Sequence, residues 1–220
     1  LRRRDRPEWD VTGEADEEPD EFEQALFAMR DRLFAIIKPE TPVSFDEKLD
    51  RLHLACCEMQ NEYDDLLFPV EGDAEYADEE DEPFRWSAMF WSEACLKALT
   101  ERLMSLEINK DDWRTLLTGA KARLPEIIAR REAFLQAYQG KRHEYDNLLT
   151  YFMYRHFMKA LGDDAVQDKV QLALVSTAVI QLLDVYEWLA KGEVTHWAQI
   201  CICKAYSREI EYNEDNTEQL

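Results

Sequence analysis

The chain has 220 residues, of which 47 are acidic and 26 basic, giving a formal net charge of −21. Nucleic acids and anionic membrane surfaces attract clustered Lys and Arg, so this balance argues against both as partners. Only 6 Gly and 7 Pro are present and 46% of the residues are hydrophobic. This composition favours one helical domain with a sizeable core.

Much of the negative charge lies in two runs. Residues 14–23 hold seven acids and residues 71–82 hold eight, and neither run contains a base. Such runs are typical of solvated loops, although an acidic loop can also bind a basic protein partner. We predict an irregular charged arm over residues 1–19 and an acidic loop over residues 69–83.

Two helices are predicted near the start of the chain. Apolar residues recur at three-to-four spacing from about residue 20 to 37, and Pro39 ends the pattern. Ser44 and Glu47 have the spacing of a capping box, which begins a second helix running to about residue 67.

Three further helices are predicted before the middle of the chain. The first is aromatic at its start and continues over residues 84–106. Asn109 is a plausible N-cap for a short helix over residues 111–124. Pro125 suits the first turn of the next helix, which runs to about residue 139.

Residues 141–161 predict a helix that is apolar on most of its circumference, which is typical of a central, buried helix. The apolar side chains on one side are those of Leu149, Phe152 and Met153, and those on the other are Tyr151, Tyr154 and Met158.

A long apolar helix follows over residues 166–191, with Gly192 as the residue that ends it. Thr195 is expected to cap the last long helix, which runs to about residue 212. Residues 214–220 are predicted to be a polar tail.

The predicted fold is all-α. We expect a single irregular bundle of about seven or eight helices within residues 20–213, with the central helix 141–161 packed on segments 164–191 and 195–212. Strands are not expected, because β-branched runs with period two are absent.

The chain shows no secretory signal, and its longest apolar stretch, residues 170–183, is interrupted by four polar residues. We therefore expect this stretch to be too short and too polar to cross a bilayer. The first residue is Leu1 rather than Met, which suggests a piece of a longer protein.

The five cysteines do not form a ligand framework. Cys56 and Cys57 are adjacent, Cys95 is alone, and Cys201 and Cys203 are separated by one residue. Adjacent helical residues diverge by about 100°, so we do not expect such pairs to converge on one metal. Reduced, buried cysteines in a cytoplasmic protein are the favoured interpretation.

Two carboxylate-x-x-His pairs, Asp50 with His53 and Glu193 with His196, have the spacing used in ferritin-like di-metal sites. That spacing works only when both members are helical, and Glu193 precedes the Thr195 cap. We therefore predict no metal site. His156 lies on an apolar face, which favours a buried, hydrogen-bonded histidine over a general base or ligand.

A polar cluster is predicted on the last helix, in Tyr-Ser-Arg-Glu-Ile-Glu-Tyr at residues 206–212. Arg208 and Glu211 are expected to share a face, and Asn147 and Arg155 on the helix 141–161 could approach them. Such a cluster either pins helices together or forms a polar pocket for a ligand or peptide.

These two motifs carry a resemblance to a known family. Tyr-Asp-Asn-Leu at residues 145–148, then the long apolar helix, then Ser-Arg-Glu-Ile-Glu at residues 207–211, are similar to the C-terminal region of the flagellin lysine-N-methylase family. In the second motif Ser207, Arg208 and Glu211 match the family pattern. The resemblance covers residues 141–213, and the family's cysteine-rich motifs, which lie N-terminal to this region, are absent from the chain.

The resemblance implies methylation of lysine in a flagellin-like protein substrate, with S-adenosylmethionine and an iron–sulfur cluster as cofactors. This segment would then be the substrate-side or scaffolding part. The alternative is a non-catalytic helical adaptor that binds a basic protein through its acidic loops. The candidate residues of the substrate pocket are Tyr145, Asn147, Tyr154, Arg155, Arg208 and Glu211.

Overall fold

The computed structural model describes residues 19–69 and 84–220. The predicted charged arm and most of the predicted acidic loop lie outside these residues. Within them the chain is helical and contains no strand, and eight of the α-helices are longer than ten residues. The all-α prediction is therefore confirmed for the described residues.

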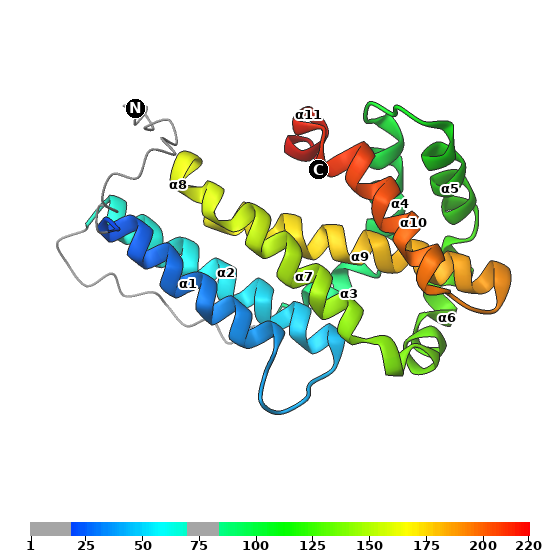
Figure 1. The fold of residues 1–220 in the computed structure, drawn as a ribbon, viewed down its shortest axis with the longest axis horizontal. Coiled ribbons are helices and arrows are strands. Elements are labelled where there is room, and N and C mark those ends of the chain that lie inside the picture. Colours follow the sequence, from blue (N-terminus) through cyan, green and yellow to red (C-terminus); the bar gives the residue numbers. More distant parts are fainter. Residues whose placement is uncertain (1–18, 70–83) are drawn as a thin grey trace.

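The elements run in chain order from the blue to the red end of Figure 1. They are α1 Glu21–Ile37, α2 Phe45–Leu67, α3 Trp86–Phe90, α4 Glu93–Ser105, α5 Asp111–Ala122, α6 Leu124–Ala137, the 3₁₀ turn η1 Gln139–Lys141, α7 His143–His156, the 3₁₀ turn η2 Phe157–Lys159, α8 Ala160–Asp163, α9 Val166–Lys191, α10 His196–Tyr206, the π-helical turn η3 Ser207–Glu211 and α11 Glu214–Glu218.

The central element is α9. It runs through the body of the molecule and packs against α2, α5, α6, α7 and α10 (Figure 1). Every residue from 176 to 185 is buried, so more than two helical turns have no solvent-facing side. Gly192 ends the helix with φ 81°, a left-handed conformation that costs glycine little, as its position predicted.

The helix 141–161 was predicted to be the central one, and this is wrong in part. Its main segment, α7, packs on α9 through buried residues such as Phe152, but Tyr151 and Tyr154 face outward. Tyr154 is 73% exposed. The error arose because a tyrosine ring counts as apolar in a periodicity analysis, although its hydroxyl allows it to lie at the surface.

The predicted starts of the first two helices are confirmed by their caps. Asp20 and Glu23 form a full capping box at α1, each side chain bonding the other residue's backbone N–H. The Ser44 side chain accepts a hydrogen bond from the Glu47 N–H at 3.0 Å, which caps α2. α1 and α2 then pack side by side along much of their length (Figure 1).

Two boundaries in the middle of the chain differ from the prediction. The predicted helix 84–106 is two helices, α3 and α4, because Ser92 accepts from the Cys95 N–H at 3.2 Å and starts a new helix. Asn109 does not cap α5, since Lys110 occupies that position without a side-chain bond. The Asn109 N–H instead donates to Glu209 at 2.6 Å.

The predicted polar tail is a structured element. α11 folds back over the connection between α4 and α5, held by the buried side chain of Asn216. Its amide donates to the carbonyl oxygens of Glu107 and Glu209 at 2.8 and 2.7 Å, and its carbonyl accepts from the Glu107 N–H at 3.1 Å. The C-terminal segment is polar in composition but packs on the body of the protein, because Asn216 forms hydrogen bonds with buried backbone groups.

By length and composition alone, α9 is apolar enough to cross a membrane, contrary to the expectation from its polar residues. In the fold, however, 67% of its most apolar 18-residue window is buried by other helices. The hydroxyls of Ser176 and Thr177 bond carbonyls one turn earlier in the same helix. Burial of this kind is what a core helix of a globular protein requires.

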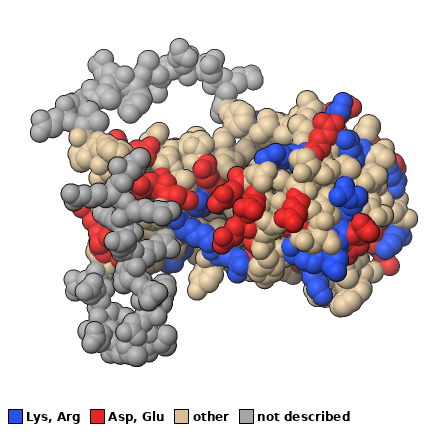
Figure 2. All heavy atoms as spheres, turned by 90° about the horizontal axis from the view of Figure 1, so that it is seen from above, with Lys and Arg blue, Asp and Glu red and all other residues tan. Residues whose placement is uncertain are grey.

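The charges of the folded body are mixed in sign. Figure 2 shows acidic and basic side chains lying beside one another on the face it presents. Opposite charges also pair within the described residues, for example Lys121 with Glu101 at 3.2 Å and Arg32 with Glu62 at 2.6 Å. This mixture agrees with the sequence analysis, which assigned much of the excess negative charge to the two acidic runs.

Candidate functional site

The polar motif predicted on the last helix adopts a π-helical turn, η3, at Ser207–Glu211. The turn is closed by the Tyr212 N–H, which donates to the Ser207 carbonyl oxygen five residues earlier at 2.9 Å. Such turns insert one extra residue into a helix and occur frequently at functional sites. The extra residue here turns Glu209 and Glu211 inward, and both are buried.

Glu211 connects η3 to α7. Its carboxylate accepts from the Tyr151 hydroxyl at 2.6 Å and forms an ion pair with Arg155, whose Nε lies 2.5 Å away; His156 Nε2 lies at 3.8 Å. Burial, together with the positive charge of Lys159, lowers the pKa of His156 to about 4, so this imidazole is neutral at neutral pH. This agrees with the prediction of a buried histidine.

The space around Glu211 is closed. A small void lies between α7, α9 and η3, and its lining leaves no room even for a water molecule. Phe152 and Tyr206 fill the neighbouring space with rings whose centroids are 5.9 Å apart. The cluster joins helices but offers no cavity for a ligand.

Arg208 points away from Glu211. Its guanidinium donates to Glu209 at 2.6 Å and to Asp112 of α5 at 2.7 Å. The predicted shared face of Arg208 and Glu211 is therefore wrong. The prediction assumed an α-helix, whereas the π-helical turn changes which side chains lie together.

A second buried acid lies with Tyr145. The Tyr145 hydroxyl and the Gln199 amide both donate to Asp184 Oδ2, at 2.8 and 3.1 Å, while Asp184 Oδ1 has no partner within the described residues. Burial raises the pKa of Asp184 to about 7. Tyr145 is ten residues before Arg155, which is about 15 Å along a helix. The cluster around Asp184 is therefore separate from the cluster around Glu211.

Of the six residues predicted to line a substrate pocket, the structure brings Arg155 and Glu211 into direct contact. Tyr145 bonds Asp184, Arg208 bonds Asp112, and Asn147 and Tyr154 are exposed on α7. These residues do not line one cavity. Their roles in binding a substrate stay predictions.

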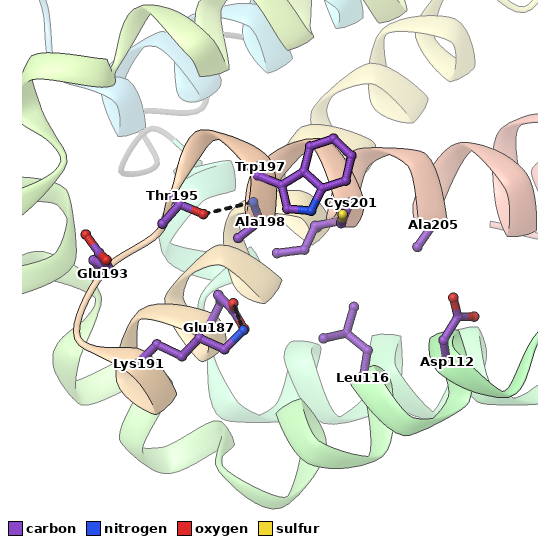
Figure 3. Close-up of a pocket in the computed structure, with 11 residues that line it drawn as sticks. Asp112, Leu116, Glu187, Lys191, Glu193, Thr195, Trp197, Ala198, Cys201 and Ala205 are labelled. Atoms are coloured by element: carbon purple, nitrogen blue, oxygen red, sulfur yellow. Dashed lines mark hydrogen bonds and ion pairs between the residues drawn. The ribbon is translucent and has the colours of Figure 1, made fainter.

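A surface groove lies elsewhere, between α5, the end of α9 and α10. Its volume is about 510 Å³, within the range of small-molecule and side-chain sites. Figure 3 shows side chains from these three elements converging on a common hollow. The apolar lining consists of Leu116, Trp197, Ala198, Ile202 and Ala205.

The charged lining of the groove is mostly acidic. It contains three carboxylates, those of Asp112, Glu187 and Glu193, and one lysine, Lys191. Lys191 already pairs with Glu187 at 2.5 Å, and Asp112 pairs with Arg208. The carboxylate of Glu193 has no ion-pair partner within the described residues, which leaves it available to a cation.

The groove was not predicted from the sequence. The main signal for it is Trp197, a large aromatic residue two positions after the Thr195 cap, in the first turn of α10, that is 72% exposed. Large exposed aromatic residues often mark binding sites. The groove's residues come from three separated segments, so their proximity follows only from the packing.

Neither of the two carboxylate-x-x-His pairs forms a metal site. Asp50 accepts from the backbone N–H and the hydroxyl of Ser87, at 2.7 and 3.0 Å, and so anchors α3. His196 Nδ1 lies 3.7 Å from Glu144 rather than beside Glu193. His53 has other neighbours: its ring nitrogen and the sulfurs of Cys56 and Cys57 all lie within 4.8 Å of one another.

The expectation that adjacent cysteines cannot share a metal site was therefore too strict. His53 is three residues before Cys56 and four before Cys57, so on a helix it lies next to both. All five cysteines are free; Cys56 is buried and Cys201 exposed, and Cys57, Cys95 and Cys203 are half-buried.

The fold and the groove define an all-helical domain with an acidic, aromatic surface site. A family model, described as the FliB lysine N-methylase C-terminal domain, matches residues 45–220, and the chain belongs to this family. The matched region covers α2 through α11 and includes every residue of the groove. No curated protein and no solved structure matches the chain.

Proposed function

We propose that this chain is the substrate-side part of a flagellin lysine methylase and that its groove receives a lysine-bearing segment of the protein substrate. The observation that carries the proposal is that the exposed Trp197 and the carboxylates of Glu187 and Glu193 line the same groove. The family membership supplies the chemistry, since the family is named for a lysine methylase.

The groove matches the chemistry of a lysine side chain. The ammonium group would lie over the Trp197 ring and near Glu193, where a cation–π contact contributes about 0.5–1 kcal/mol at an exposed site. The four-carbon stem would lie along Leu116 and Ile202, because long cationic side chains bury their stems against apolar surface. The excess of carboxylates attracts a basic segment before contact is made.

Methyl transfer needs more than this groove. The amine attacks only as its neutral form, whereas nearby carboxylates favour the ammonium. The target lysine must therefore leave the carboxylates and lose its proton as it reaches the methyl donor. The groove's role is to capture and orient the substrate.

The described residues do not fit the cofactors that the family implies. The groove offers no free cation to the carboxylate of S-adenosylmethionine, because its only lysine is paired with Glu187. An iron–sulfur cluster takes four thiolates, whereas two cysteines at most lie together with another metal-binding side chain in the described residues. We infer that both cofactors bind outside this groove.

The test compares groove variants with matched variants elsewhere on the surface. Trp197→Ala and Glu193→Gln are paired with Phe68→Ala, an aromatic residue also 72% exposed, and with Glu40→Gln, an exposed glutamate in the α1–α2 loop. Binding to flagellin is measured by calorimetry, and methylation in the full-length protein by mass spectrometry.

The groove variants should weaken flagellin binding by about tenfold and raise KM more than they lower kcat, because they remove contacts that precede the chemistry. The matched variants should behave as wild type. Equal binding by wild type and Trp197→Ala would refute the groove as the substrate site.

The adaptor alternative predicts a different pattern. Binding through residues 71–82 would weaken steeply with salt and disappear when that segment is deleted. Under our proposal the deletion changes methylation little, and Trp197→Ala changes it strongly. A deletion that abolishes binding while Trp197→Ala leaves it intact would establish the adaptor function.

A further inference from the structure

His53, Cys56 and Cys57 project from one side of α2, near the start of α9. The distance from His53 Nε2 to the Cys57 sulfur is 4.0 Å, and all three donor atoms lie within 4.8 Å of one another. They come from one uninterrupted helix, so the spacing is set by helical geometry. The proposed function does not use any of these residues.

We propose that His53, Cys56 and Cys57 form a zinc-binding site. Zn–S bonds of about 2.3 Å and Zn–N bonds of about 2.0–2.1 Å place tetrahedral ligand atoms about 3.5–3.8 Å apart. The three donors therefore need to move together by about 1 Å at most, which side-chain rotation provides. Two thiolates and one imidazole bind zinc in preference to magnesium or calcium, which favour oxygen ligands.

The surrounding side chains support thiolate ligands. The Gln171 amide donates to the Cys56 sulfur at 3.6 Å, and the Gln167 amide donates to the Cys57 sulfur at 3.6 Å. Hydrogen bonds donated to sulfur stabilise its negative charge, and outer partners of this kind accompany metal ligands. Both glutamines come from α9, so the second helix supplies the support while α2 supplies the ligands.

His53 needs one local rearrangement. Gln171 Nε2 lies 2.5 Å from His53 Nδ1, and Gln171 Oε1 accepts from the Trp86 indole N–H at 2.9 Å. This arrangement leaves the ring proton of neutral His53 on Nε2. Coordination through Nε2 moves that proton to Nδ1 and turns the Gln171 amide so that its oxygen accepts it. The turned amide gives up its bonds to the Cys56 sulfur and the Trp86 indole N–H, so in the zinc complex the Gln167 amide is the donor that supports a thiolate.

The proton balance follows from the ligands. Without a metal, burial raises the pKa of the Cys56 thiol to about 12, so this thiol carries its proton at neutral pH. Cysteine binds Zn²⁺ as the thiolate, so each of the two thiols loses its proton to solvent on coordination, and His53 stays neutral. The complex has two thiolates, one imidazole and a fourth position for water.

The arrangement differs from that of a structural zinc site. All three protein ligands come from one helix, so the metal would not join separate parts of the chain. Three protein ligands with an open fourth position are typical of sites where zinc binds and polarises a further molecule. His53 and Cys57 are half-buried, which leaves a path from solvent.

The test uses the whole chain, reduced and stripped with a chelator. Zn²⁺ affinity is measured by competition with a chromophoric chelator, and Co²⁺ is added separately to detect thiolate-to-metal absorption. We expect one metal per chain and release of two protons. His53→Gln and Cys57→Ser should each lower the affinity by roughly 100-fold or more, since even outer partners cost 10–100-fold.

Cys95→Ser is the matched control, because Cys95 is also half-buried but lies apart from the cluster. It should bind zinc as wild type does, and the helical circular dichroism of all three variants should stay unchanged. Cys56 is fully buried and is not substituted, since a polar residue there risks misfolding. The proposal would be overturned if the wild-type protein bound no stoichiometric zinc. It would also be overturned if His53→Gln and Cys57→Ser bound zinc with the affinity of the wild type.

Discussion

Arg155 on α7 and Glu211 on the π-helical turn form an ion pair, with Nε and Oε1 2.5 Å apart. The carboxylate is buried and the guanidinium is partly exposed, so the two partners are not equivalent. Glu211 depends on Arg155 for its counter-charge, whereas water can solvate Arg155 if Glu211 is lost. The pair links α7, the helix that carries the first motif of the family resemblance, to Glu211 of the second motif.

Replacing Arg155 should therefore cost more than replacing Glu211. Arg155→Leu leaves a buried carboxylate with Tyr151 as its hydrogen-bond donor, and we expect it to lower the free energy of unfolding by about 2 kcal/mol. This is less than for a fully buried pair, because the guanidinium is partly solvated. Glu211→Gln keeps both acceptor contacts and should cost about 1 kcal/mol. Urea unfolding measures both, and an equal or reversed order would contradict the asymmetry.

Asp184 should make stability fall as pH rises. Its pKa is raised by burial from 3.8 to about 7, so the folded state holds a proton that the unfolded state has lost. The stabilising contribution is complete below about pH 4 and disappears as the pH passes about 7, amounting to roughly 4 kcal/mol at most. Relative to wild type, Asp184→Asn should gain stability between pH 5 and 8. Unfolding curves at pH 5, 6, 7 and 8 measure this difference, and parallel curves would show that Asp184 does not titrate in this range.

His156 should act in the opposite direction. Burial lowers its pKa from 6.5 to about 4, so its contribution is present above about pH 6.5 and is lost as the pH falls towards 4. In wild type the two groups oppose each other over the same range. His156→Gln should leave the Asp184 effect, so that stability falls more as the pH rises from 4 to 7, and Asp184→Asn should leave the His156 effect, so that stability falls more as the pH drops from 6.5 to 4. The same pH series on the two variants separates the contributions.

Asn216 should hold the C-terminal helix in place. Asn216→Ala removes three hydrogen bonds to the backbone of Glu107 and Glu209, and leaves buried backbone groups without partners. We expect a loss of about 2–3 kcal/mol and faster amide exchange over residues 213–220. Asp215→Ala, an exposed neighbour, is the control and should change little. Unchanged exchange in Asn216→Ala would mean that other contacts fix α11.

Local chemistry made much of the fold predictable. The Ser44 cap, the Gly192 terminator and the Thr195 cap are each set by residues within one helical turn, and α2 and α9 end within a residue of their predicted limits. The split between α3 and α4 was missed because the apolar pattern continues across Ser92. The π-helical turn was missed because the extra residue leaves no signal in a 3.6-residue period.

The sequence by itself determined an all-helical chain, the limits of most of its helices and its family, because caps, periodicity and short motifs act over a few neighbouring residues. Only the tertiary structure decided which helix is central, where Arg208 points and that Trp197 lines one groove with Glu187 and Glu193. Those relationships join segments far apart in the chain, and they depend on how whole helices pack. The same holds for support of the Cys56 and Cys57 sulfurs by glutamines from α9, which no spacing within α2 could reveal.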